Sequence, residues 1–158
     1  MKAWNEEILE FVKLASEHGV RMILVGGGAV NFHGYQRHST DVDFWIDTSE
    51  VNFERLVNVF QELGYDLVRF PDDVVEERQN ISVKFSPEDL RLELITHFSL
   101  NRSFEEAYED SEMVVTERGQ SIMKWHVLSY VDLIDSKLKS QRPKDLLDIQ
   151  ELERIKNI

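Results

Sequence analysis

The sequence predicts an α+β fold, in which helices flank a small mixed sheet and a C-terminal helical pair closes one side. Three observations lead to this expectation. Amphipathic helical stretches alternate with short apolar runs in the first part of the chain. Short strand-like segments separated by turn residues follow in the middle. From Ser129 onward the pattern is helical, so we expect an α+β core over 1–126 and a helical pair over 127–158 that packs on it.

The first part of the chain is predicted to run helix, strand, glycine turn and strand. Residues 4–18 place apolar side chains on one helical stripe, which Gly19 ends. Residues 20–25 form an apolar run that is too short for a helix and indicates a buried strand. Residues 26–34 hold four of the seven glycines of the chain and are expected to form a turn and a short helical segment. A second strand is predicted over 41–46.

The next segments are predicted as one helix and three strands. Ser, Thr and Asp residues precede a helix expected over about 50–63, because such side chains accept hydrogen bonds from the first turn. Residues 65–70, 81–85 and 90–96 are strand candidates, and a turn that contains Pro87 joins the last two.

The remaining elements carry local signals of their own. Ser103 and Glu106 form a capping box that begins a short helix. Residues 113–116 and 121–125 flank an Arg-Gly turn and predict a hairpin. The helical tail then contains a second helix that begins near Pro143, since proline is favoured in a first helical turn.

Composition excludes several classes of protein. The chain of 158 residues contains no cysteine, which excludes disulfides, thiolate catalysis and thiolate metal sites. Its 18 basic and 30 acidic residues give a net charge of −12, which disfavours a general coating of nucleic acid. The first residues carry acids where a signal peptide needs an apolar run, and no apolar stretch approaches the roughly 20 residues that span a bilayer. We therefore expect a cytoplasmic protein with no membrane partner.

The segment from Gly26 to Ile46 carries the strongest chemical signal. Asp41 and Asp43 are two residues apart on a predicted strand, so their carboxylates share one face. Two such carboxylates repel each other, and a hard divalent cation such as Mg²⁺ relieves the repulsion. The glycine turn before them offers backbone N–H groups at a helix start, which suit phosphate oxygens. Either feature alone is common, but with 13 residues between Gly27 and Asp41 they together predict a metal and phosphate site.

These residues belong to a longer pattern that reaches the helical tail. It resembles the signature of the polymerase-β-like nucleotidyltransferase superfamily: a hydrophobic residue, Gly-Gly or Gly-Ser, a spacer of about this length, and Asp-x-Asp. The pattern is also similar to that of small bacterial and archaeal proteins near the AbiEii-type toxins, which add an Arg-x-Ser/Thr before the aspartates and a helical Lys…Arg-x-Lys-Asp…Asp segment. The matching residues are Gly26, Gly27, Ala29, Arg37, Ser39, Asp41, Asp43, Lys137, Arg142, Lys144, Asp145 and Asp148.

The resemblance implies a palm-like nucleotidyltransferase fold and a set of site residues. A third carboxylate on a later strand is implied, and Glu93 is the candidate because it lies on the face opposite Leu92 and Leu94. Asp41, Asp43 and Glu93 would then hold two Mg²⁺ ions. The nucleotide phosphates would be contacted by the residues Gly26, Gly27, Arg37, Ser39, Lys137 and Lys144. For Asp145 and Asp148 a catalytic role and a structural ion-pair role both stay open.

The function implied is Mg²⁺-dependent transfer of a nucleoside monophosphate from an NTP to a hydroxyl acceptor. RNA ends such as those of tRNA, small molecules and protein side chains are all compatible acceptors. A toxin-like role with a cognate antitoxin as partner is also implied. The alternative is a catalytically silent nucleotide-sensing or partner-binding module on the same fold. Mg²⁺-dependent NTP binding without release of pyrophosphate would distinguish that module from the enzyme.

Overall fold

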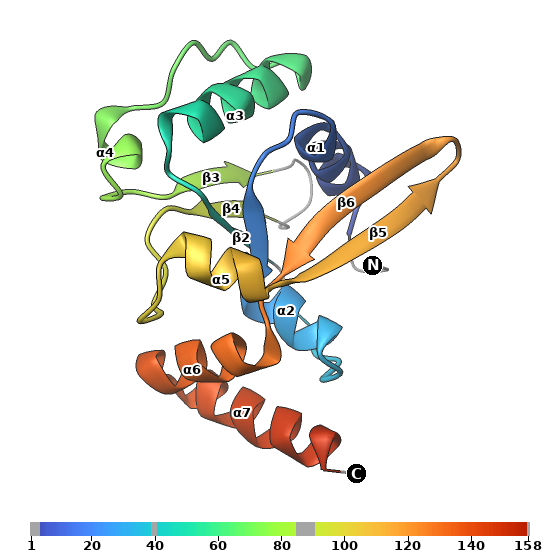
Figure 1. Ribbon diagram of the computed structural model, residues 1–158, viewed down its shortest axis with the longest axis vertical. Coiled ribbons are helices and arrows are strands. Elements are labelled where there is room, and N and C mark those ends of the chain that lie inside the picture. Colours follow the sequence, from blue (N-terminus) through green and yellow to red (C-terminus); the bar gives the residue numbers. More distant parts are fainter. Residues whose placement is uncertain (1–3, 39–40, 85–90, 158) are drawn as a thin grey trace.

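Six strands form one mixed sheet in the computed structural model, which describes residues 4–38, 41–84 and 91–157 (Figure 1). The strands are β1 (Met22–Val25), β2 (Asp41–Ile46), β3 (Ile81–Lys84), β4 (Arg91–Ile95), β5 (Glu112–Arg118) and β6 (Ser121–Val127). Their order across the sheet is β3-β4-β2-β1-β6-β5. The pairs β2–β4 and β1–β6 are parallel, whereas β1–β2, β3–β4 and β5–β6 are antiparallel. The prediction of a small mixed sheet is therefore confirmed.

Seven helices accompany the sheet within the described residues. They are α1 (Glu6–Glu17), α2 (Gly26–Phe32), α3 (Glu50–Glu62), α4 (Asp72–Val75), α5 (Phe104–Asp110), α6 (Tyr130–Ser140) and α7 (Pro143–Lys156). Figure 1 shows α6 and α7 side by side at one end of the molecule, as the sequence predicts for the C-terminal part. The short helix α2 contacts β1, β2 and α6, so it joins this helical pair to the sheet. No helix of the described chain is both long and apolar enough to cross a bilayer.

The core has two layers because β2 presents large apolar side chains to both faces of the sheet. Phe44 packs against Trp4 and Phe11 on the side of α1. Trp45 packs on the opposite face against Phe98 and Phe104, the first residue of α5. The second half of β2 is thus covered on both sides. Its first half has polar residues, Asp41 and Asp43, on the same face as Trp45.

Two local predictions differ from the structure. Residues 65–70, expected as a strand, form an irregular connection between α3 and α4. Its apolar residues serve as anchors instead, since the ring of Phe70 packs against Phe53 and Phe60. The glycine segment also differs, because α2 begins at Gly26 itself, whereas a turn was expected there. The predicted turn at Pro87 lies outside the described residues.

Candidate active site

The three predicted carboxylates lie next to one another on one face of the sheet. Asp41 and Asp43 are two residues apart on β2, so their side chains point to the same face. Strand β4 runs parallel to β2, and the register pairs Asp43 with Glu93. All three residues are partly buried. We refer to Asp41, Asp43 and Glu93 as the carboxylate row.

Negative charge is concentrated at the centre of this row. Burial, together with the charges of Asp41 and Glu93, raises the pKa of Asp43 to about 6. Lys144 and Lys137 act in the opposite direction without cancelling the effect. The net effect of these charges at Asp43 is therefore that of negative neighbours, which favours the binding of a cation.

Gly26 stands directly against the centre of the row. It is the first residue of α2, and its φ of +61° is one that residues with a side chain rarely adopt. A Cβ built on Gly26 would lie 2.6 Å from Oδ2 of Asp43. Glycine is thus required here twice, once for the backbone conformation and once for the close approach of the carboxylate.

The other two glycines of the segment have different surroundings. Gly27 is buried in the first turn of α2. Gly28 packs against β1, where an added Cβ would lie 2.9 Å from Cδ1 of Leu24. The predicted contact of Gly26 and Gly27 with phosphate stays a prediction, and the structure adds a role in admitting the Asp43 carboxylate.

Arg37, expected at the phosphates, is held by the helical tail. Its Nε and Nη2 donate to the two carboxylate oxygens of Asp148, at 2.8 and 3.0 Å. Its backbone N–H donates to Oδ1 of Asn31. This arrangement fixes the segment before β2 to α7. Ser39, the neighbouring candidate, lies outside the described residues.

The helical tail contains a buried ion-pair network. The ammonium group of Lys137, only 5% exposed, lies 2.9 Å from Oδ2 of Asp148 and 3.3 Å from Oδ1 of Asp145. Arg142 donates from Nε to Oδ2 of Asp145 at 2.7 Å, and Ser140 donates to the same oxygen. This network supports the structural interpretation of Asp145 and Asp148 over the catalytic one.

The partners of Asp145 outweigh the cost of burying it. Burial by itself would raise the pKa of this carboxyl group. Hydrogen bonds from Arg142 and Ser140, together with the charge of Lys137, hold the pKa of Asp145 below its usual value. Asp145 therefore stays ionised because the chain itself supplies the compensating groups.

Lys144 differs from these neighbours because it is exposed. It lies in the first turn of α7, next to the buried Asp145, and its charge acts on Asp43. The charge at the start of α7 is therefore close enough to the carboxylate row to act on Asp43. Of the two tail lysines expected at the phosphates, Lys144 is accessible and Lys137 is committed to the ion-pair network.

The row fits Mg²⁺ by the chemistry of its donors. Carboxylate oxygens are the ligands that this hard cation prefers, and a bound cation would offset the burial and the charges of Asp41 and Glu93 that raise the pKa of Asp43. However, the side chains of the described residues include no group of three or more His, Asp or Glu already arranged to hold a metal ion. The backbone register brings the carboxylates together, but their oxygens are not gathered around one point.

Two cations beside the row were not identified from the sequence. The register pairs Asp41 with Arg91, and Arg91 with Lys84 on β3. Both basic residues are exposed and share the face of the row. In both segments the alternation of polar and apolar residues indicates a strand with one polar face. Only the pairing of β3 with β4 places Lys84 and Arg91 next to each other on that face.

Comparison with known proteins gives one finding. Residues 4–158 match the model of a protein family described as "Nucleotidyltransferase of unknown function (DUF6036)". No curated protein matches the chain.

Proposed function

The chain belongs to this nucleotidyltransferase family, and from that premise we propose that it transfers a nucleoside monophosphate from an NTP to a hydroxyl acceptor with Mg²⁺ at the carboxylate row. The single observation that carries the proposal is the juxtaposition of Asp41, Asp43 and Glu93 on one sheet face. Burial and the charges of Asp41 and Glu93 raise the pKa of Asp43, and this supports the proposal because a bound cation would offset that negative charge.

The three carboxylates would hold the metal, with two ions as the full complement. When bound, Mg²⁺ acts as a Lewis acid that lowers the pKa of the acceptor hydroxyl and offsets the charge on the departing pyrophosphate. In the transfer, the acceptor oxygen bonds to the α-phosphorus while the bond from that phosphorus to the bridging oxygen of the β-phosphate breaks. The acceptor proton passes to a carboxylate of the row, for which we assign Glu93.

The rest of the chain positions the nucleotide. We place the triphosphate beside Gly26 and Gly27, where no Cβ keeps a ligand away from the backbone. Lys144 is exposed and acts on Asp43, so we assign it to the phosphates. Lys137 contributes its charge from within the ion-pair network, and Arg37 positions the segment before β2 through Asp148. Ser39 is proposed as a hydrogen-bond donor to phosphate.

The acceptor is proposed by class. RNA ends, small molecules and protein side chains offer the required hydroxyl group. A toxin-like role with a cognate antitoxin, and a location in the cytoplasm, rest on the resemblance described above. A second candidate function is a catalytically silent nucleotide-sensing or partner-binding module, and one observation favours it: the described residues hold no ready three-ligand metal site.

One experiment separates these functions. The protein is incubated with each α-labelled NTP and Mg²⁺ against total RNA, lysate protein and a small-molecule panel, while pyrophosphate release is measured. We expect Asp41→Asn and Asp43→Asn each to reduce transfer by at least about 100-fold, as removal of a transition-state-stabilising group does. Glu54→Gln, an exposed carboxylate on α3, serves as the matched control and leaves transfer unchanged.

A binding measurement completes the test. Mg²⁺ with a non-hydrolysable NTP analogue is expected to raise the melting temperature of the native protein, because a ligand that binds only the folded state stabilises it. Asp43→Asn removes this rise. Retained transfer in either aspartate variant would overturn the enzyme proposal. Metal-dependent NTP binding with no pyrophosphate release on any acceptor would establish the silent module instead.

A further inference from the structure

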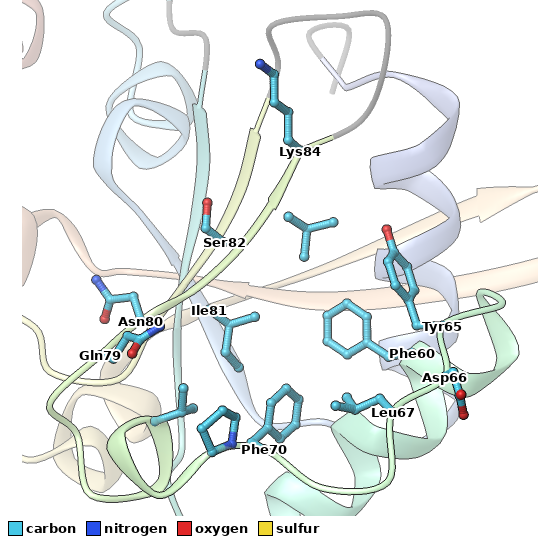
Figure 2. Close-up of a pocket in the computed structure, with 13 residues that line it drawn as sticks. Phe60, Tyr65, Asp66, Leu67, Phe70, Gln79, Asn80, Ile81, Ser82 and Lys84 are labelled. Carbon is cyan, nitrogen blue, oxygen red and sulfur yellow. The ribbon is translucent and has the colours of Figure 1, made fainter.

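A groove of about 460 Å³ lies along β3, the last strand of the sheet (Figure 2). Within the described residues, β3 has a hydrogen-bonded strand neighbour on one side only, which is β4. The opposite wall of the groove comes from the end of α3, the connection to α4, and α4 itself. The groove volume is within the range of about 300–1,000 Å³ that is usual for ligand sites.

The backbone edge of β3 forms part of the groove wall. Residues 79–84 line the groove without interruption. Ile81 and Val83 lie on one face of the sheet, and Ser82 lies on the other face, opposite Glu93 in the ladder. A cavity beneath one face alone would be lined by every second residue. The continuous lining fits a groove that follows the strand edge, where the backbone N–H and C=O groups have no strand partner among the described residues.

The interior of the groove is apolar. Figure 2 shows the side chains of Phe60, Tyr65, Phe70 and Ile81 converging on it, whereas Lys84 points away. Phe60 and Phe70 are buried and fixed against each other, with ring centroids 6.1 Å apart. Tyr65 is 44% exposed and stands at the rim. Its ring packs edge-on against Phe60, with ring centroids 5.6 Å apart, so the open space lies between these rings and β3, where it suits one large apolar side chain.

The chain segment that forms the wall opposite β3 carries a net negative charge. Residues 62–78 contain six acidic and two basic residues, and Asp66 among them lines the groove. Arg78 pairs with Asp73 and Glu76, which leaves four acidic residues and one basic residue of the segment outside these pairs. An occupant that extends beyond the apolar interior therefore meets negative charge, which favours basic flanks.

We propose that this groove binds an extended peptide segment of a partner protein. The segment adds a strand to the free edge of β3, places one large apolar side chain against the rings of Phe60, Tyr65 and Phe70, and carries basic residues on both sides of it. Main-chain hydrogen bonds give affinity in this mode of recognition, and the pocket for a single side chain gives specificity. The interaction is independent of the proposed transfer reaction, although the added strand would join the sheet that holds Glu93.

The test uses a fluorescent peptide, acetyl-Lys-Thr-Val-Phe-Val-Thr-Lys-amide, and fluorescence anisotropy with the full chain. We expect Tyr65→Arg to weaken binding by about 10-fold or more, the scale of a central contact residue. The matched control is Val68→Arg, which lies in the same connection, is 81% exposed and does not line the groove, so its binding stays unchanged. Equal melting temperatures of the two variants show that folding is intact.

Altered peptides identify the mode of binding. Replacing both valines by proline removes two N–H donors and is expected to weaken binding strongly, while replacing both lysines by glutamate weakens it through charge. The proposal is overturned if the parent peptide does not bind, if the proline peptide binds equally well, or if N-acetylphenylalanine amide competes at the same concentration. It is likewise overturned if sedimentation shows a dimer that Tyr65→Arg dissociates, because the occupant is then a second copy of this chain.

Discussion

Two groups of acidic residues in this protein differ in how their negative charge is compensated. Asp145 and Asp148 in the tail are almost fully buried and are neutralised by groups of the chain itself. Asp41 and Asp43 on β2 are only partly buried, yet the pKa of Asp43 is raised to about 6 by burial and by its acidic neighbours. The more deeply buried carboxylates are thus the better compensated ones.

The comparison shows how to distinguish a structural charge from a functional one. A buried charge is costly unless it is paired and hydrogen-bonded, so a carboxylate that serves only the fold is expected to have its partners within the chain. A carboxylate whose pKa is raised by burial and by like charges is instead a candidate for a functional site. Asp43 in the carboxylate row meets the second description, and the tail network meets the first.

The largest effect on stability is expected in the tail network. Asp148→Ala leaves Arg37 and Lys137 without their shared partner, and breaking such a buried pair is expected to cost about 3–5 kcal/mol of unfolding free energy. Asp135→Ala, at an exposed position of α6, is the control and should change it by less than about 0.5 kcal/mol. Urea denaturation measures both. Equal stability of the two variants would show that the ion pairs of Asp148 do not stabilise the fold.

The stability contributed by Asp43 in the carboxylate row should change with pH in the opposite direction to that contributed by Asp145. In the folded protein the pKa of Asp43 is raised from 3.8 to about 6, so the protonated form is favoured by folding. The contribution of Asp43 to stability is therefore fully present below pH 4 and is lost as the pH rises through 6. At neutral pH, Asp43→Asn should exceed the native protein in stability, by an amount on the order of 3 kcal/mol at most.

The measurement is the unfolding free energy of both proteins between pH 3.5 and 7.5. The two curves should converge at low pH and separate above it. Asp145 provides the internal contrast, because its pKa lies below the usual value and its contribution is lost as the pH falls. Parallel curves for the native protein and Asp43→Asn would show that the row carries no unfavourable charge.

The smallest effect concerns the glycine beside the row. Gly26→Ala and Gly119→Ala place alanine at the same φ of +61°, which costs about 1–2 kcal/mol in each case. An added Cβ meets Oδ2 of Asp43 only at Gly26, since Gly119 has no neighbouring atom within 4 Å. The difference between the two melting temperatures isolates this contact. Gly26→Ala should also weaken Mg²⁺ binding, and equal behaviour of both variants would show that Gly26 does not shape the row.

The sequence by itself determined the features that depend on local spacing. The period of a strand places Asp41 and Asp43 on one face whatever the rest of the chain does. The capping box of Ser103 and Glu106 is present in the structure, because its hydrogen bonds join groups only three residues apart. The hairpin of β5 and β6 and the start of α7 at Pro143 are local in the same sense.

Tertiary structure decided everything that joins distant segments. The pairing of β2 with β4 places Glu93 beside Asp43, and the pairing of Arg37 with Asp148 spans 111 positions of sequence. The apolar residues around Phe70 have the composition of a strand, yet they anchor a connection because the rings of Phe53 and Phe60 lie within reach. Periodicity reports which face of an element is apolar. The element that covers this face, and the charged residues that pair with one another, depend on packing between distant segments. No local sequence pattern encodes that packing.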